Sequence, residues 1–371
     1  MTAAEAPVER VAAAVYRIPT DAPEADGTIA WDSTTMVTVT VTAGGRTGLG
    51  ASYTAQAAQH LVEQTLAPVV TGRCALDVTA AYQAMHRAVR NIGRPGVAAT
   101  AISAVDIALW DLKARLLDLP LARLLGVVRT AVPVYGSGGF TTYDDRQLTA
   151  QFGGWVHEQG IPRVKMKIGE SWGGHVERDL ARIRLARQVI GPHAALYVDA
   201  NGAYQRKQAI RVAQAAAGHD IAWFEEPVSS DDLDGLRQVR DAVLPDVAAG
   251  EYGYDLPYFA RMIGAGAVDC VQADLTRCGG ITEWRNVVAV AAAHGLQVSG
   301  HCAPHLHRDV AAATPNLRHL EWFHDHVRIE SMLLDGAAAA PDPGGTLAPN
   351  LSAPGHGLSL DQDRAQQYRI G

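Results

Sequence analysis

The chain has 371 residues and a formal net charge of −7, with acidic and basic side chains interspersed along its length. Hydrophobic residues make up 48% and charged residues 19%, which indicates a large buried core and argues against disorder. With no basic stripe, and no apolar run of the roughly 20 residues that span a bilayer, the sequence predicts neither nucleic acid nor a membrane as a partner.

Cysteine spacing and the amino-terminal residues bear on where the protein works. The four cysteines, Cys74, Cys270, Cys278 and Cys302, show no paired spacing. This indicates a reduced, cytoplasmic protein rather than a disulfide scaffold. Residues 1–19 lack a basic segment followed by an apolar core, so no signal peptide is predicted. A chain of this length predicts about two domains.

The first third of the chain has a strand-then-helix pattern. Residues 11–18 and 35–42 are predicted antiparallel strands, and the turn AGGRTG joins the second of them to a strand at 49–54. Helical patterns follow, the longest at 101–117, which ends before Pro120 and Gly126. Strands followed by helices predict a separate α+β domain.

From Val132 to about Glu321 one unit repeats: a short apolar run, a polar turn and an amphipathic stretch such as residues 175–190. Eight such units predict an α/β fold with a parallel (β/α) barrel, although a doubly wound open sheet has the same local pattern. The apolar runs are 132–135, 164–168, 196–198, 222–224, 247–249, 268–272, 296–299 and 317–320.

Two lysines, Lys165 and Lys167, lie two residues apart in the second run and therefore project to the same face of a strand. If that face is the barrel interior, two buried lysines need an anionic neighbour. An edge strand with solvated lysines fits the same pattern.

Three carboxylates follow the next three runs at regular intervals. Glu225 follows Asp199 by 26 residues, and Glu251 follows Glu225 by the same interval. Adjacent barrel strands would bring them to one point, because barrel enzymes place their catalytic groups at the carboxyl ends of the strands. Three acids so close repel unless a hard cation binds them, and oxygen ligands favour Mg²⁺, with Mn²⁺ as a substitute. Ordinary helix N-capping is the alternative.

The last three runs end near Asp274, His301 and Glu321. An Asp beside a His orients the ring and raises its basicity, which suits a general base. A strand-end His alone is more often structural, but the position of His301 two units beyond the acid cluster favours catalysis. Five further histidines between residues 305 and 326 fit no standard zinc spacing.

In order, the motifs are KMK, DANG, EEP, GE, Asp274 followed by RCGG, SGH and LEW, with a closing PGHGLSL. This order resembles the enolase superfamily, in its mandelate racemase (mandelate racemase/muconate lactonizing enzyme) subgroup, over nearly the whole chain. The resemblance implies a (β/α)7β-type barrel at 128–335, an N-terminal α+β capping domain at 1–127, and a C-terminal segment at 336–371 that packs back on the cap.

The resemblance also implies roles. The three carboxylates would bind Mg²⁺, which stabilises an enediolate formed from a small carboxylate substrate. Lys167 would be the base on one face of the α-carbon, with Lys165 assisting at the carboxylate. His301, oriented by Asp274, would be the acid or base on the opposite face.

Two further residues and the assembly follow from the same likeness. Glu321 would donate to the second carboxylate oxygen, and Asn201 would lie beside the substrate's α-hydroxyl. Muconate-lactonising and dipeptide-epimerising relatives carry a lysine about where this chain has Asp274, so those activities are disfavoured. Because the family is commonly oligomeric, a homo-oligomer is expected.

Two bases permit two reactions. Returning the proton on the other face gives racemisation or epimerisation of a 2-hydroxy acid, whereas expelling a β-hydroxyl gives a 2-keto-3-deoxy acid. We expect residues 19–32 to form a capping loop whose acids, with Trp31 as the one aromatic, suit a polyhydroxylated acid. Thr141 adds a hydrogen-bonding group near the pocket. The loop acids are Asp21, Glu24, Asp26 and Asp32.

Dehydration of an acid sugar is therefore favoured over racemisation, although loop acids that simply face solvent would leave that choice open. A barrel that binds metal without turnover is a third alternative. It is disfavoured because every expected catalytic position is filled.

Overall fold

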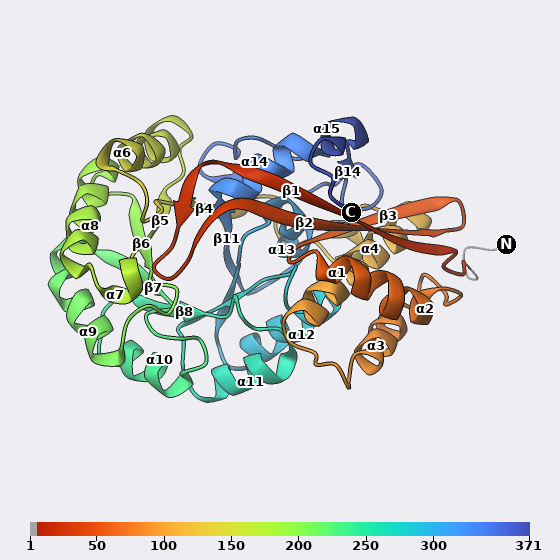
Figure 1. The fold of residues 1–371 in the computed structure, drawn as a ribbon, viewed down its shortest axis with the longest axis horizontal. Helices are drawn as coiled ribbons and strands as arrows, with labels where there is room; N and C mark the ends of the chain where they lie inside the picture. Colours follow the sequence, from red (N-terminus) through yellow and green to blue (C-terminus); the bar gives the residue numbers. More distant parts are fainter. Residues whose placement is uncertain (1–5) are drawn as a thin grey trace.

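The computed structural model describes residues 6–371. The first five residues, part of the stretch predicted to lack a signal peptide, lie outside the described residues. A three-stranded antiparallel sheet with packed helices precedes a closed barrel of eight parallel strands (Figure 1). The predicted fold class, a barrel with an N-terminal α+β cap, is confirmed, and the open doubly wound sheet is excluded.

The cap sheet has the strand order β1-β2-β3 and buries one face against helices. Val37, Val39 and Val41 of β2 join the core cluster on this face, while Met36 joins a second cluster on the opposite face, as the two-residue period of a strand requires. The strands are β1 (Arg10–Ala25), β2 (Ala30–Ala43) and β3 (Arg46–Tyr53). The cap helices are α1 (Ala57–Leu61), η2 (Val62–Leu66), α2 (Ala67–Val70), α3 (Val78–Ala88), α4 (Val97–Leu116) and α5 (Leu121–Leu125).

Helix α4 joins the cap to the barrel and is buried on nearly all sides. Its Asp106 accepts hydrogen bonds from the main-chain N–H (2.9 Å) and the hydroxyl (2.6 Å) of Thr282, at the start of a barrel helix. Trp110 donates to the same hydroxyl at 2.9 Å. A helix that packs on both neighbours is apolar all round, which explains its weak amphipathic pattern.

The barrel closes where its last strand pairs with its first. Its strands are β4 (Val132–Gly138), β5 (Arg163–Lys167), β6 (Ala195–Asp199), β7 (Ile221–Glu225), β8 (Asp246–Ala249), β9 (Cys270–Ala273), β10 (Gln297–Gly300) and β11 (Leu317–Phe323). Each lies within three residues of its predicted apolar run. The helices are α6 (Asp145–Gly153), η3 (Gly154–Glu158), α7 (Glu170–Gly173), α8 (Val176–Ile190), α9 (Arg206–Ala215), η4 (Ala217–His219), α10 (Leu233–Arg240), α11 (Leu256–Gly264), α12 (Gly280–Ala293), α13 (Pro304–Ala312) and α14 (His324–Leu333).

Strand register sets which polar side chains become neighbours. Lys167 of β5 pairs in register with Asp199 of β6, which in turn pairs with Glu225 of β7. All three are the last residues of their strands. Parallel register therefore aligns a cation and two carboxylates at the carboxyl end of the barrel.

The prediction of a loop at residues 19–32 is wrong. β1 continues to Ala25 and β2 begins at Ala30, so these residues form a long hairpin whose turn is only residues 26–29. The hairpin crosses the open end of the barrel (Figure 1). Its register shifts between Pro19 and Glu24, so the ladder is interrupted where Pro19 and Pro23 lack an N–H to donate.

The last part of the chain returns to both the barrel and the cap. β13 (Thr346–Leu347) adds to β4 in antiparallel fashion, and β12 (Leu334–Asp335) pairs with β14 (Ser359–Leu360) before α15 (Gln362–Gln366). The Ile370 N–H donates to Val15 O of β1 at 2.9 Å. The predicted domain boundaries remain predictions. None of the described helices combines the length and apolar character needed to cross a membrane.

Close packing of β3 on α4 predicts a sensitive position at Gly50. A Cβ there would lie 2.1 Å from Ala104 O and 2.6 Å from Ala108 N, both main-chain atoms that cannot rotate away. We expect Gly50→Ala to lower the free energy of unfolding by about 1–3 kcal/mol, measured as a lower urea midpoint. Gly264→Ala, at an exposed helical position with open space, is the control; equal midpoints for the two variants would contradict this packing.

Candidate active site

Charged side chains from seven consecutive strands gather at the carboxyl end of the barrel. All are nearly or wholly buried. They are Lys165 and Lys167 on β5, Asp199 on β6, Glu225 on β7, Glu251 after β8, Asp274 after β9, His301 after β10, and Glu321 on β11. The exposed edge strand considered for the two lysines is therefore wrong, because Lys165 is fully buried.

Asp199, Glu225 and Glu251 form a group that fits a divalent cation. Each offers an oxygen within 4.8 Å of the other two. Burial, reinforced by Asp199, raises the pKa of Glu225 to about 8 even though Lys165 opposes the shift. Glu251 Oε2 is buried and accepts no hydrogen bond of good geometry, although His301 Nε2 lies 3.2 Å away. A hard cation would relieve both of these penalties, so these residues fit Mg²⁺.

The two lysines neutralise the same carboxylates. Lys165 forms an ion pair with Glu225 and lies 2.8 Å from Glu321 and 3.4 Å from Asp199. Lys167 Nζ lies 2.5 Å from Asp199 Oδ2. Burial opposes both charges, but the surrounding carboxylates hold the pKa of each ammonium group above its ordinary value.

His301 and Asp274 form the pair that the sequence predicted. His301 Nδ1 lies 2.8 Å from Asp274 Oδ2, while Asp274 Oδ1 accepts from the N–H and hydroxyl of Thr276. The other nitrogen, Nε2, lies 3.2 Å from Glu251 Oε2. Burial lowers the pKa of the imidazole. Cys302 and Glu251 together raise it by more than burial lowers it, so the pKa stands well above its ordinary value.

Glu321 is an acceptor in this arrangement. Its Oε1 accepts from Ser137 at 2.6 Å and its Oε2 accepts from the main-chain N–H of Cys302 at 3.0 Å. Although burial raises the pKa of the carboxyl, Lys165 and His301 pull it well below its ordinary value. The donor role that the resemblance implies requires a proton that these contacts disfavour, and it remains a prediction.

Asn201 lies at the cavity, held in a left-handed conformation with φ of +46°. Its main-chain N–H donates to Asp199 Oδ1 at 2.9 Å, and its side-chain Oδ1 is buried without a partner. An unpartnered polar atom beside a cavity suits contact with a ligand.

Sequence reasoning missed Arg277. Its guanidinium donates to Glu251 at 3.2 Å, lies 3.5 Å from Asp274 Oδ2, and sits over the ring of Tyr252. It thereby links the carboxylate group to the His301 pair. Its place three residues after Asp274, in the RCGG motif, was the available signal.

A cavity of about 280 Å³ lies between the barrel end and the cap hairpin. Lys167, Asn201, Glu251, Arg277 and His301 line its barrel side. Its cap-side wall consists of hairpin and β3 residues together with His326 of α14: Asp26, Ile29, Trp31, Ser33, Thr34, Thr35, Tyr53, Thr54 and His326. The predicted substrate residue Trp31 thus reaches the cavity.

Thr141 does not line that cavity. Its hydroxyl donates to Asp26 O at 2.7 Å, and its main-chain N–H donates to Ala25 O at 2.9 Å. The structure thus places Thr141 as an anchor for the hairpin turn, where the sequence analysis expected a group near the substrate.

The four hairpin acids do not gather at the cavity as the loop prediction supposed. Asp21 pairs with His324 at 3.0 Å, and Asp32 is exposed. Asp26 reaches the cavity, but its carboxylate accepts from the turn residues Thr28 and Ile29. Glu24 is buried and accepts from the indole of Trp31 at 2.7 Å.

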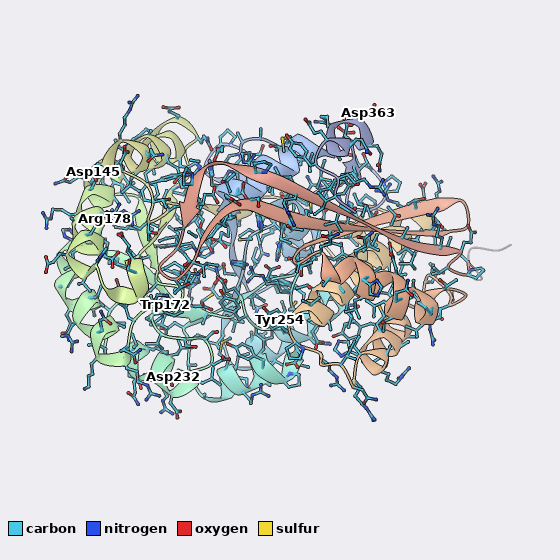
Figure 2. All side chains as sticks on the ribbon, viewed as in Figure 1. Asp145, Trp172, Arg178, Asp232, Tyr254 and Asp363 are labelled. Carbon is cyan, nitrogen blue, oxygen red and sulfur yellow. The ribbon has the colours of Figure 1, made fainter. Side chains whose placement is uncertain are left out.

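A second, larger cavity of about 550 Å³ adjoins the first and shares Asn201 and Tyr252 with it. Trp172 and Tyr254, labelled in Figure 2, line this outer cavity. The main-chain N–H of Trp172 donates to Gly27 O of the hairpin turn at 2.9 Å. The outer cavity gives the inner one a broad approach.

Two family profiles match the chain. The N-terminal domain of mandelate racemase / muconate lactonizing enzyme matches residues 12–126, and the enolase C-terminal domain-like profile matches residues 147–364. The chain belongs to the mandelate racemase/muconate lactonizing enzyme family of the enolase superfamily. It is an enzyme of the lyase or isomerase class, and its cofactor is Mg²⁺.

Several curated relatives are named for reactions of sugar acids, and one for epimerisation of hydrophobic dipeptides. The chain is 32% identical to 3,6-anhydro-alpha-L-galactonate cycloisomerase of Streptomyces coelicolor, over 98% of this chain and 100% of the relative. It is 33% identical to L-talarate/galactarate dehydratase of Salmonella typhimurium, over 78% of this chain and 73% of the relative.

Solved structures of the family share the whole fold. A mandelate racemase/muconate lactonizing enzyme-like protein from Rubrobacter xylanophilus is 49% identical, with a TM-score of 0.93 over 98% of this chain and 100% of that one. A racemase from Streptomyces coelicolor A3(2) with bound magnesium is 31% identical, with a TM-score of 0.91 over 98% of this chain and 100% of that one.

The carboxylate group predicts metal-dependent stability. We expect saturating Mg²⁺ or Mn²⁺ to raise the unfolding temperature, since a ligand at 100 times its Kd adds about 2.7 kcal/mol. Asp199→Asn, Glu225→Gln and Glu251→Gln should each abolish the rise, whereas exposed Glu177→Gln should keep it. The assay is thermal unfolding with a metal titration; a rise that survives all three changes would place the metal elsewhere.

The raised pKa of Glu24 leads us to expect that the free energy of unfolding depends on pH. Burial raises its pKa from 4.5 to about 8, with help from Asp325 and against its bond to Trp31. The folded state thus keeps a proton that the unfolded state loses, so stability declines as the pH rises from about 4.5 to about 8.

We therefore expect Glu24→Gln to match wild type near pH 5 and to exceed its stability by a few kcal/mol, roughly, above pH 8. Urea unfolding across this pH range measures the difference. Asp32→Asn, on the same hairpin but exposed, should show no such trend. A difference between Glu24→Gln and wild type that does not vary with pH would show that Glu24 is not responsible.

Proposed function

We propose that this enzyme removes the α-proton of an acid sugar and expels its β-hydroxyl as water, giving a 2-keto-3-deoxy acid. The observation that carries the proposal is that Lys167 of β5 and His301 beyond β10 line one cavity. The carboxylate group lies on the strands between them. Two proton-transfer groups separated by a cation site suit abstraction of a weakly acidic proton.

Metal binding falls to Asp199, Glu225 and Glu251 in this proposal. When bound, Mg²⁺ supplies the positive charge that stabilises the negative charge developing on the substrate carboxylate, and it offsets the carboxylates that hold Lys167 protonated. Lys165 adds a second positive charge beside the same carboxylates.

Each proton transfer belongs to a named atom. Neutral Lys167 Nζ takes the α-proton, and the C–H electrons form a carbon–carbon double bond. His301 Nε2, whose raised pKa keeps it protonated, gives its proton to the β-hydroxyl as the carbon–oxygen bond breaks. Water leaves, and the enol becomes the 2-keto acid. Asp274 holds the imidazole for this donation at 2.8 Å.

Binding of the sugar chain falls to Asn201, beside the α-hydroxyl, and to the polar cap-side wall. Thr34 and His326 of that wall offer an acceptor and a donor. Trp31 contributes an aromatic face. A wall of this kind suits hydroxyl groups better than an aryl ring. Relatives that dehydrate galactarate, gluconate and arabinonate support this substrate class.

A second candidate is ring opening of an anhydro sugar acid. A ring ether oxygen on the β-carbon would leave in the same way as a hydroxyl, with His301 Nε2 as the proton donor. A relative that aligns with 98% of this chain is a cycloisomerase of an anhydrogalactonate, and this favours the candidate. Racemisation, in which His301 returns a proton to the opposite face, is the remaining alternative from the sequence.

The proposal includes a cytoplasmic, homo-oligomeric protein. Cys270, Cys278 and Cys302 are buried and form no disulfide, as a reducing compartment requires.

Removing each proton-transfer group should separate the two steps. We expect Lys167→Ala to lose both α-proton exchange in D₂O and 2-keto acid formation, by about 10²–10⁴-fold. His301→Asn should lose keto acid formation to a similar extent while keeping exchange. Nuclear magnetic resonance on a panel of mono- and diacid sugars with Mg²⁺ follows both signals.

Exposed Lys207→Ala is the control. The reverse pattern would exchange the roles of the two residues. Exchange without any keto acid in the wild type would establish a racemase or epimerase and reject elimination.

A further inference from the structure

The first turn of α14 carries His326, a residue that neither the metal site nor the proton transfers use. Its ring stacks on Tyr53 of β3, with ring centroids 3.4 Å apart, and lines the inner cavity. Its Nδ1 accepts a hydrogen bond from the main-chain N–H of Ala303 at 3.2 Å. Because Nδ1 is occupied as an acceptor, the proton of the neutral ring lies on Nε2.

His326 stays neutral because burial lowers its pKa to about 3, with a further contribution from the charge on His301. No acceptor for Nε2 exists among the described protein residues. Unlike the atoms buried without partners, Nε2 is not sealed away from the cavity. It is therefore a fixed donor without a protein partner.

Five other donors of the cap-side wall are directed into the protein. The Trp31 indole donates to Glu24, the Thr34 hydroxyl to Asp325, and the Tyr53 hydroxyl to Glu330. Ser33 donates to Asp32, and Thr54 pairs with Thr100. This leaves His326 and the hydroxyl of Thr35 as the wall's donors to a ligand, and of the two only His326 is a ring held in one orientation by stacking.

The charges behind this wall are mainly negative. Asp325 and Glu330 are buried directly behind it, against Thr34 and Tyr53. Glu24 is buried there too, but its raised pKa keeps it protonated near neutral pH, so it adds no charge. Arg328 is engaged by Asp325 and by Pro19 O, and His305 is engaged by Glu330.

The described cations that line the cavity are also engaged. Lys167 is held by Asp199, and Arg277 and His301 are held by Glu251 and Asp274. Within this inner cavity a second carboxylate on the substrate would meet no uncommitted cation and would face buried negative charge. The exposed Arg261 lines only the outer cavity.

We propose that the enzyme selects a monocarboxylate whose far end is uncharged, and that His326 binds a hydroxyl or ether oxygen of that end through Nε2–H. This inference rests on the proposed function and narrows its substrate from acid sugars in general to aldonic acids and their anhydro forms. His326 is a binding residue in this account and takes no part in proton transfer.

Matched acid pairs test the selection without any mutation. Galactonate and galactarate, and likewise gluconate and glucarate, differ only in whether the last carbon is a hydroxymethyl or a carboxylate. α-Proton exchange in D₂O and keto acid formation, both with Mg²⁺, give kcat/KM for each. We expect the monoacid of a reactive pair to exceed its diacid by at least ~100-fold.

Variants test the residue. His326→Leu should lower kcat/KM for the monoacid by about 10–100-fold, mainly through KM, while His326→Gln, which keeps a donor, should recover part of the loss. His324→Leu is a matched control, because this histidine lies two residues away and pairs with Asp21 outside the cavity. Thermal unfolding verifies that each variant folds.

Each outcome decides between the two proposals. Diacids that react as well as monoacids would overturn the selection and leave the proposed function standing. If neither monoacids nor diacids exchange their α-proton, both the selection and the proposed function are overturned. An unchanged KM in folded His326→Leu, or a loss confined to kcat, would remove His326 as a binding residue even where monoacids are preferred.

Discussion

The structure is organised around an unfavourable arrangement: several like charges are held close together away from water. Asp199, Glu225 and Glu251 converge in a buried space where mutual repulsion and desolvation both act against ionisation. Lys165 and Lys167 make this arrangement tolerable from the neighbouring strand. A site of this kind lowers the stability of the folded protein. It is well suited to binding a divalent cation and an anionic substrate together.

The remaining architecture keeps that arrangement fixed. In-register parallel strands present Lys167, Asp199 and Glu225 side by side, so their separation is set by the ladder itself and does not depend on flexible loops. Two polar contacts carry this order outward, from Arg277 to Glu251 and from Asp274 to His301. Preorganised charges need no rearrangement at the moment of reaction.

Sequence reasoning reached the barrel and its charged ring because both follow from periodicity. An apolar run that ends in a carboxylate, repeated at 26-residue intervals, is typical of barrel strands that carry ligands at their carboxyl ends. The hairpin was missed because Pro19, Pro23 and Gly27 have the local signature of a loop. Its strand geometry depends on contacts far away in sequence, such as Thr141 with Asp26 and His324 with Asp21.

His326 and Arg277 were missed for a related reason, since a lone histidine or arginine has many ordinary roles. Only the stacked Tyr53 ring, the Ala303 N–H and the carboxylates around Arg277 reveal what these side chains face.

The cap-side wall is built by two segments almost 300 residues apart. The hairpin and β3 supply Thr34 and Tyr53, while α14 supplies their partners Asp325 and Glu330, with separations of 291 and 277 residues. A chimaera that exchanged the cap between relatives and kept the resident α14 would break these pairs and remove one donor from each of two buried carboxylates. Transplanting substrate preference within the family therefore requires moving α14 together with the cap.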